Sequence, residues 1–300
     1  MAEPRISVII PHLNQPEGLG RCLASLAAGA RAPDEVIVVD NGSAEAPHAI
    51  CAAHGAMLLF EEGSGPGPAR NRGVAASGGA ILAFIDADCI ADPGWIAAIE
   101  TAFADPAAKI LGGDVRIAMD DPDRPTLLEA YESIYAYRMD RYIAEQGFTG
   151  TGNLAMRRAV FEAVGPFRGL EVAEDRDWGQ RATRAGHDLL YVPSMRVYHP
   201  ARTSFAELAR KWDRHTAHDY AAWRVRRWGR LRWGLRALAM ALSPPAELGR
   251  VLASDRVRGA RARALAWAGV ARVRLYRAWV MARLLAGVDA EALAGRWNRG

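Results

Sequence analysis

The chain has 300 residues, of which 50% are hydrophobic and 24% are charged, a balance that excludes disordered and fibrous proteins. The longest segment without a charged residue, Ala46 to Phe60, is too short for the ~18 apolar residues of a membrane-spanning helix. Cys22, Cys51 and Cys89 lack metal-ligand spacing, which excludes a zinc finger and a disulfide framework and predicts a reducing compartment. The N-terminus has no export signal, so we expect a cytoplasmic protein.

Charge is distributed unevenly along the sequence. The whole chain carries +4, but residues 201–300 hold 21 Lys or Arg against 7 Asp or Glu, so they carry +14 and the first 200 residues carry −10. Seven of the nine Trp also follow residue 200. This division predicts a catalytic domain over residues 1–205 and a basic helical extension over residues 206–300.

The first 85 residues alternate between short apolar runs and helical patterns. Strands are expected at Arg5 to Pro11, Asp34 to Asp40, Met57 to Phe60 and Ala80 to Ile85. Helices are expected at Leu19 to Ala30, around Ile50 to Ala53, and at Ala69 to Ala76. Such alternation predicts an α/β fold with a mostly parallel sheet covered by helices on both faces, and with ligands at the carboxyl ends of the strands.

The pattern is weaker beyond residue 111. Leu127 to Ile143 is rich in tyrosine and predicts a single helix, whose aromatic rings pack or line an acceptor site. Glu174 to Gly186 predicts another helix, and Leu189 to Val192 a strand that reaches His199. After Pro200 the chain is predicted to be helical, with a break at Ser243-Pro-Pro245.

Polar side chains follow three of the predicted strands. Asp86 and Asp88 form an Asp-x-Asp pair after the fourth strand, and two carboxylates at this spacing suit a hard divalent cation. Asp40 ends the second strand and could accept a hydrogen bond from a base or ribose, and Asn14 follows the first. The alternatives are a helix cap for one Asp of the pair and an Asx turn for Asp40.

Three further features have chemical potential. Gly65 to Gly73 could place Arg70 and backbone amides near a diphosphate, or be a plain connector; it is no Walker A loop, since no Gly-Lys-Ser/Thr follows. Glu174-Asp175 opens a helix, where a carboxylate stays ionised and suits a general base. The alternative is that the pair is only the acidic start that many helices have. His199 is either a packed side chain or a third metal ligand.

In this order, the motifs resemble family 2 glycosyltransferases of the GT-A fold over residues 5–205. The matching segments are Ser7-Val-Ile-Ile-Pro-His-Leu-Asn14, Glu35-Val-Ile-Val-Val-Asp-Asn-Gly-Ser43, Gly67-Pro-Ala-Arg-Asn-Arg-Gly73, Leu82-Ala-Phe-Ile-Asp-Ala-Asp-Cys89, Thr151-Gly-Asn-Leu-Ala-Met-Arg-Arg158, and Glu174-Asp175 with Arg181. The resemblance implies that residues 1–110 bind a nucleotide-diphospho-sugar and residues 111–205 the acceptor.

The resemblance also implies a role for each matching residue. Pro11, Asn14 and Asp40 would bind the base or ribose, and Arg70 would lie near the diphosphate. Asp88 would be the principal ligand of Mg or Mn, with Asp86 on the sugar, ribose or metal. Asp175 would be the catalytic base, with Glu174 as its substitute. The acceptor-binding residues would be Gly152, Asn153 and Trp178.

The implied reaction is transfer of one sugar, from a UDP-sugar by preference, to a hydroxyl of a polysaccharide- or lipid-linked acceptor, with inversion at the anomeric carbon. His12-Leu13 departs from the family pattern and leaves the base open. The Gln-x-x-Arg-Trp motif of processive synthases is absent. A sugar nucleotidyltransferase and a catalytically silent binding module are the alternatives; the first would need a Gly-rich basic loop after the first strand.

The basic extension interleaves arginine with tryptophan and aliphatic residues. Val270, Val273, Val280 and Leu284 share one helical face, interrupted by Arg277. This pattern is typical of a helix on an anionic membrane surface, here the inner face of the cell membrane. The alternatives are helices packed on the protein or on another copy, and, with least support, a nucleic-acid-binding patch.

Overall fold

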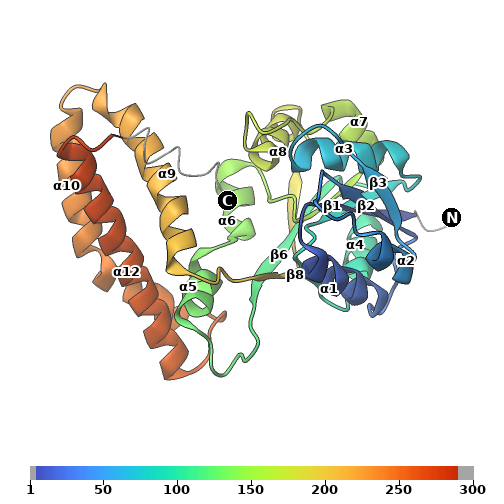
Figure 1. Ribbon diagram of the computed structural model, residues 1–300, viewed down its shortest axis with the longest axis horizontal. Coiled ribbons are helices and arrows are strands. Elements are labelled where there is room, and N and C mark those ends of the chain that lie inside the picture. Colours follow the sequence, from blue (N-terminus) through green and yellow to red (C-terminus); the bar gives the residue numbers. More distant parts are fainter. Residues whose placement is uncertain (1–4, 290–300) are drawn as a thin grey trace. The chain divides into compact units, whose positions relative to one another are not determined.

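The computed structural model describes residues 5–289, which divide into two compact units (Figure 1). The first unit contains the residues up to Arg116 and Tyr137–Pro200, and the second contains Ile117–Ala136 and the residues from Ala201 onward. This division, between Pro200 and Ala201, lies five residues before the boundary that we expected after residue 205. Residues 117–136, which we assigned to the acceptor half, belong to the second unit because their helix packs against the longest helix there.

The first unit is built on a mixed sheet. Its strands, among the described residues, are β1 (Ile6–His12), β2 (Glu35–Asp40), β3 (Met57–Phe60), β4 (Ile81–Ile85), β5 (Ile90–Ala91), β6 (Ile110–Ala118), β7 (Asn153–Arg157) and β8 (Leu189–Pro200). They lie in the order β3-β2-β1-β4-β7-β6-β8-β5. The first four strands along this order pair in parallel, as predicted, whereas β7 pairs antiparallel with β4 and β6, and β5 with β8.

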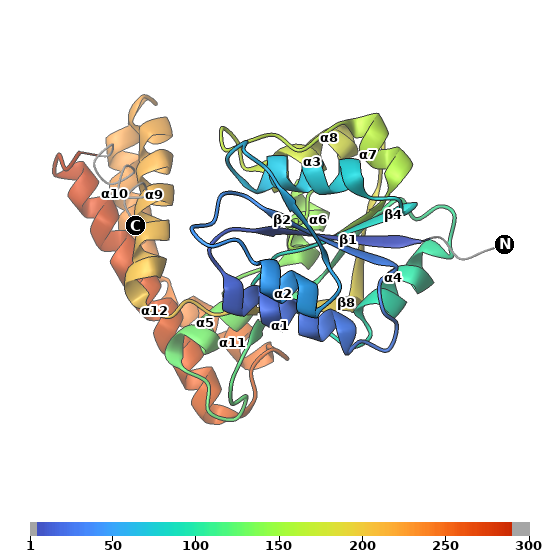
Figure 2. The ribbon, with the colours of Figure 1, turned by 45° about the vertical axis from the view of Figure 1, so that its right-hand side comes forward.

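Helices cover both faces of this sheet, which confirms the predicted fold class (Figure 2). One face carries α1 (Pro16–Ala27), α2 (His48–Ala53) and α4 (Trp95–Phe103), and the other α3 (Pro66–Ala76), α7 (Arg158–Val164) and α8 (Glu174–Arg184). Successive side chains of β1 divide between the two cores: Ile6, Val8 and Ile10 on one side, Ile9 on the other. This alternation is the period of two that a strand buried on both faces imposes.

The predicted helix from Leu127 to Ile143 is wrong, because two helices replace it. α5 (Leu127–Tyr135) starts with a capping box at Thr126, and α6 (Met139–Gln146) belongs to the first unit. Between them Ala136 is extended and Tyr137 has a φ of 49°, in the left-handed region that side chains rarely adopt. Residues in such conformations cluster at functional sites, and the Tyr137 ring contacts the His199 ring at a tilt of 34°, with centroids 4.6 Å apart.

The second unit is helical. In addition to α5 it contains α9 (Phe205–Arg224), α10 (Gly229–Leu242), the 3-10 turn Pro244–Glu247, α11 (Leu248–Ala253) and α12 (Gly259–Leu285). α12 packs against α5, α9 and α10 (Figure 1). Within residues 5–289, no helix has both the length and the apolar content that crossing a bilayer requires.

The face of α12 that we assigned to a membrane lies in the core of this unit. Val270, Val273, Val280 and Leu284 are at most 3% exposed. Arg277, which interrupts the pattern, stacks its guanidinium 3.9 Å from the centre of the Trp212 ring. Burial lowers the pKa of this arginine. The aliphatic part of the Arg277 side chain therefore packs inside the second unit, and the valine face of α12 is buried against protein, not open to lipid.

Gly269 of α12 provides a test of this packing. A Cβ atom at Gly269 would lie 2.6 Å from Cβ of Tyr131 on α5, whereas one at Gly249 of α11 would meet nothing within 4 Å. We expect Gly269→Ala to lower the free energy of unfolding of the second unit by about 1–3 kcal/mol through overpacking. Gly249→Ala should leave it unchanged or raise it. Urea unfolding of both variants measures the difference, and equal stabilities would contradict the close helix contact.

Candidate active site

The carboxyl ends of β1 and β2 bring His12 and Asp40 together. The two residues are opposite each other in the parallel register, and both are 2% exposed. The Gln15 amide donates to Nε2 of His12, so the proton lies on Nδ1, which donates to Asp40 Oδ1 at 2.8 Å. Ser43 donates its hydroxyl to the same oxygen at 2.6 Å and its amide to Oδ2 at 3.0 Å.

These bonds define what Asp40 can do. Burial alone would raise its pKa, but hydrogen bonds from Ser43 and His12 hold it below the ordinary range, so the carboxylate is charged. Asn14, at φ 51°, accepts from the Ala44 amide at 2.9 Å and joins the same loop, with Pro11 half-buried beside it. The expected base-binding residues thus gather, and His12, which we had noted only as a departure from the family pattern, is the partner that holds Asp40.

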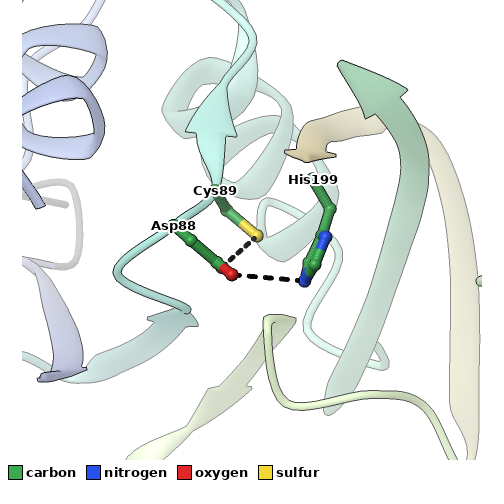
Figure 3. Close-up of side chains that lie close together, drawn as sticks. All are labelled: Asp88, Cys89 and His199. Atoms are coloured by element: carbon green, nitrogen blue, oxygen red, sulfur yellow. Dashed lines mark hydrogen bonds and ion pairs between the residues drawn. The ribbon is translucent and has the colours of Figure 1, made fainter. Parts of the chain in front are cut away.

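Asp88 and His199 lie together at the end of β8 (Figure 3). His199 Nε2 is 3.5 Å from Asp88 Oδ2, and one ligand atom each from Asp88, Cys89 and His199 lies within 4.8 Å of the others. Nδ1 of His199 donates to the Pro200 carbonyl at 2.7 Å, and the Tyr137 hydroxyl lies 3.1 Å from Nε2. A carbonyl on the far nitrogen is the usual second partner of a metal-binding histidine.

The ligand atoms that this cluster offers fit a hard divalent cation. Burial raises the pKa of Asp88, and His199 only partly opposes this, so a cation beside the carboxylate would stabilise its charged form. Burial, helped by Asp86 and Asp88, also raises the pKa of the Cys89 thiol, so this residue is no thiolate ligand for a soft metal. The available ligands are therefore one carboxylate and one imidazole.

Asp86 is not part of this cluster but pairs with Arg70. The Arg70 guanidinium is buried and donates to Asp86 Oδ1 at 2.6 Å and to Glu174 Oε1 at 3.1 Å. Asp86 is therefore placed as the partner of Arg70, and its expected role as a metal ligand stays a prediction. Arg70, expected at a diphosphate, joins two carboxylates from distant parts of the chain.

Asp175 follows in the first turn of α8. Its Oδ1 accepts from the Arg176 amide at 2.6 Å. Burial, with Glu174 and Asp86 adding to it, raises the pKa of Asp175, and Arg70 acts in the opposite direction. A carboxylate with a raised pKa binds a proton more readily than an ordinary aspartate, which suits a general base.

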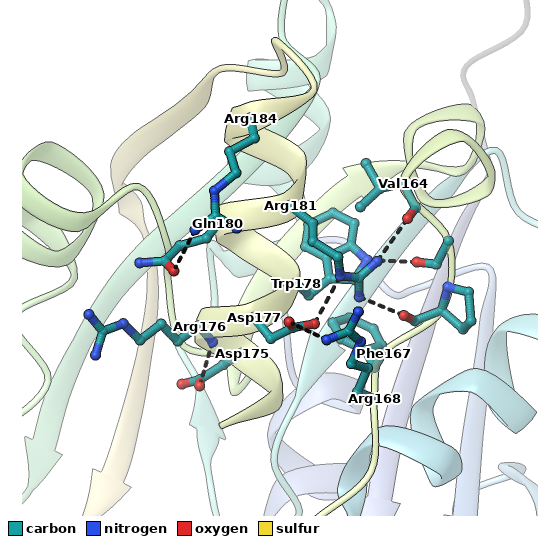
Figure 4. A network of polar contacts seen from close by, with 12 residues as sticks. Val164, Phe167, Arg168, Asp175, Arg176, Asp177, Trp178, Gln180, Arg181 and Arg184 are labelled. Carbon is teal, nitrogen blue, oxygen red and sulfur yellow. Dashed lines mark hydrogen bonds and ion pairs between the residues drawn. The ribbon is translucent and has the colours of Figure 1, made fainter. Parts of the chain in front are cut away.

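A polar network fixes the start of α8 (Figure 4). Arg181 donates to Asp177 and to the carbonyls of Val164 and Pro166, which tie α8 to the segment after α7. Trp178 donates its indole N–H to the Gly165 carbonyl at 2.9 Å and is 1% exposed. The structure thus places the Trp178 ring, which we expected at the acceptor, in the core beneath α8.

The two other expected acceptor residues have different surroundings. A Cβ atom at Gly152 would lie 2.4 Å from Asp86 Oδ2, so this glycine lets the backbone lie against the Asp86 carboxylate. Asn153 is fully buried. It accepts from Trp95 Nε1 at 2.8 Å and donates to the Asp114 and Met195 carbonyls, each at 2.9 Å. Its side chain joins β6, β7, β8 and α4, and it is not exposed to an acceptor.

Comparison with known proteins identifies the family. The model of the glycosyl transferase family 2 matches residues 7–165. The glycosyltransferase AglE of Haloferax volcanii is 33% identical over 233 residues, which cover 75% of this chain and 76% of that protein. This chain belongs to glycosyltransferase family 2.

Solved structures agree with the fold of this family 2 glycosyltransferase. The mannosyltransferase PcManGT from Pyrobaculum calidifontis, in complex with GDP-Man and Mn²⁺, aligns with a TM-score of 0.58 at 20% identity and covers 100% of this chain and 89% of its own. Glucosyl-3-phosphoglycerate synthase from Mycobacterium tuberculosis, with Mn²⁺, UDP and phosphoglyceric acid, aligns with a TM-score of 0.50 at 24% identity over 68% of this chain and 73% of its own.

Replacement of Asn153 separates a structural role from acceptor binding. We expect Asn153→Ala to lower the free energy of unfolding by about 3 kcal/mol or more, because it leaves one indole N–H and two carbonyls buried without this partner. Gln180→Ala, which removes a half-buried amide with one long hydrogen bond to the Gln146 carbonyl, should change it much less, by about 0.5 kcal/mol. Urea unfolding provides the measurement. Unchanged stability with a raised KM for the acceptor would instead support the acceptor role.

Arg70 provides a test through the pH profile. Arg70→Met removes the positive charge that lowers the pKa of Asp175, so this pKa should rise. A base works only when ionised, so activity falls as the pH drops through that pKa. We expect the acid limb of kcat/KM to move up by about one pH unit. Arg70→Lys keeps the charge without the bidentate geometry and should shift it less. Superimposable profiles for Arg70→Met and the parent would contradict the coupling.

Proposed function

We propose that this family 2 glycosyltransferase is a metal-dependent, inverting enzyme that moves one sugar from a nucleotide-diphospho-sugar, by preference a UDP-sugar, to a hydroxyl of a polysaccharide- or lipid-linked acceptor. One observation carries the proposal: Asp88, 3.5 Å from His199, follows the same strand as Asp86, which Arg70 bridges to Glu174, and Asp175 comes directly after Glu174. Leaving-group stabilisation and proton removal need these two sets of groups side by side.

The donor side of the proposal rests on Asp88, His199 and the strand-end loops. Asp88 and Nε2 of His199 would hold Mg or Mn, as their chemistry fits, and the bound ion would offset charge on the departing diphosphate. Complexes of the similar enzymes with Mn²⁺ and UDP or GDP-Man support this choice of cofactor and donor class. Pro11, Asn14 and Asp40, at the carboxyl ends of β1 and β2, would surround the base and ribose, with His12 holding Asp40 in place.

The acceptor side rests on Asp175. Arg70 engages Glu174, so of the two neighbouring carboxylates Asp175 is the one we assign as base. It would take the proton of the acceptor hydroxyl as the oxygen attacks the anomeric carbon, and this direct displacement inverts the configuration. The backbone at Gly152, against Asp86, is where we place the acceptor. The missing Gln-x-x-Arg-Trp motif supports a single transfer per encounter.

We further propose that residues 206–300 attach the protein to an anionic membrane surface, where a lipid-linked acceptor would lie. The charge of the last hundred residues supports this, since juxtamembrane arginine and lysine are attracted to anionic lipid. The buried face of α12 does not supply the contact, so another face must.

Two substitutions test the proposed mechanism. Turnover is measured as the release of nucleoside diphosphate when UDP-glucose and related nucleotide-sugars are hydrolysed with Mn²⁺. Donor binding is measured as a shift of the melting temperature. We expect Asp175→Asn to reduce turnover by roughly 100-fold or more while the donor-induced shift persists. Asp88→Asn should abolish the dependence of the thermal shift on Mn²⁺.

The same measurements on these variants also define which results would contradict the mechanism. Unchanged turnover in Asp175→Asn would remove Asp175 as the base. If no nucleotide shifts the melting temperature, with or without Mn²⁺, and no nucleoside diphosphate is released, the chain would be the catalytically silent binding module. Gln180→Ala, a substitution elsewhere on α8, serves as the matched control for handling and folding.

A further inference from the structure

Helix α10 has two apolar faces, and only one of them is covered. Trp233 and Ala237 are 1% and 8% exposed and pack with residues of α9 and α12. The indole N–H of Trp233 donates to the Met281 carbonyl at 3.2 Å, which fixes this side of the helix. The orientation of α10 within the second unit is therefore set by its buried face.

The opposite face carries a row of leucines, which we call the leucine stripe. Its members are 57–69% exposed and are Leu231, Leu235, Leu238 and Leu242. Their spacing of four, three and four residues places them within an arc of about 60° on a helix of 3.6 residues per turn. A continuous stripe of large exposed aliphatic side chains marks an interaction surface, because isolated exposed leucines would be scattered around the helix.

Every charged residue of the segment that carries the leucine stripe is an arginine, and one of them, Arg236, pairs with Asp219 at 3.2 Å. No Asp or Glu occurs between Asp219 and Glu247, a segment that contains Arg224, Arg226, Arg227, Arg230, Arg232 and Arg236. Arg230 and Arg232 lie about 100° to either side of Leu231, and both are exposed. Trp228, at the N-terminal end of the stripe, is 63% exposed and is held at φ 61°.

We propose that the leucine stripe of α10 inserts into the surface of an anionic lipid bilayer. This inference rests on the membrane attachment proposed above and assigns it to one helix face. Apolar side chains bordered by arginine, with a tryptophan at one end, match the apolar depth, the anionic headgroups and the interface of a bilayer. A second copy of the chain is a poor occupant, because pairing α10 with α10 would bring arginines against arginines.

Vesicle cosedimentation of the full chain tests this assignment. Neutral vesicles are phosphatidylcholine, and anionic vesicles contain phosphatidylglycerol in addition. We expect Leu235→Gln/Leu238→Gln to weaken partition to anionic vesicles by roughly tenfold or more. The control Met57→Gln/Leu190→Gln removes two side chains of the first unit that are 48% and 43% exposed, and it should bind as the parent does. Arg227→Gln/Arg232→Gln should lose the preference for anionic vesicles and the release by salt.

Any different result contradicts a defined part of the proposal. Parent-like binding by Leu235→Gln/Leu238→Gln would overturn the leucine stripe while leaving membrane attachment in place. No binding of the parent chain to either vesicle would overturn attachment as well. A dimer that dissociates in the leucine variant, in sedimentation velocity without lipid, would make the stripe a contact between copies. Unchanged UDP-glucose hydrolysis in the variants separates all of these results from the proposed chemistry.

Discussion

Four carboxylates, on Asp86, Asp88, Glu174 and Asp175, share one edge of the sheet, and their mutual repulsion is the constraint that the site has to meet. Arg70 meets part of it by bridging Asp86 and Glu174. The remaining two carboxylates both have raised pKa values, with burial as the main cause in each. A cation between Asp88 and His199 would relieve the first, and a proton from an acceptor the second.

The same bridge connects segments that are far apart in the sequence. Arg70 lies on α3, Asp86 follows β4 and Glu174 starts α8, so a single guanidinium joins three segments of the first unit. Its rigid geometry suits this purpose, since a guanidinium can bind two carboxylates in fixed directions. α8 is held in addition by Arg181, which donates to the carbonyls of Val164 and Pro166 and does not depend on Arg70.

The second unit uses the chemistry of arginine in a different way. Arg277 lies in the interior and stacks on Trp212, whereas Arg230 and Arg232 border the exposed leucine stripe. Arginine therefore stabilises a helical core at one position and borders an exposed apolar surface at others. Composition alone does not separate these uses, because the difference lies in which helix face is covered.

The sequence by itself determined the alternating fold and the positions of the polar strand ends. Strand and helix periods are local, and parallel strands bring their carboxyl ends to one edge, so Asp40, Asp86 and Asp88 could be placed from the chain order. The contact of His12 with Asp40 was also within reach, since both end adjacent parallel strands. Only tertiary packing placed Trp178 and Asn153 in the core, divided the tyrosine-rich helix at Tyr137, and covered the predicted face of α12 while leaving α10 open. These outcomes depend on contacts between distant segments, and no local pattern encodes which of two apolar faces finds a partner.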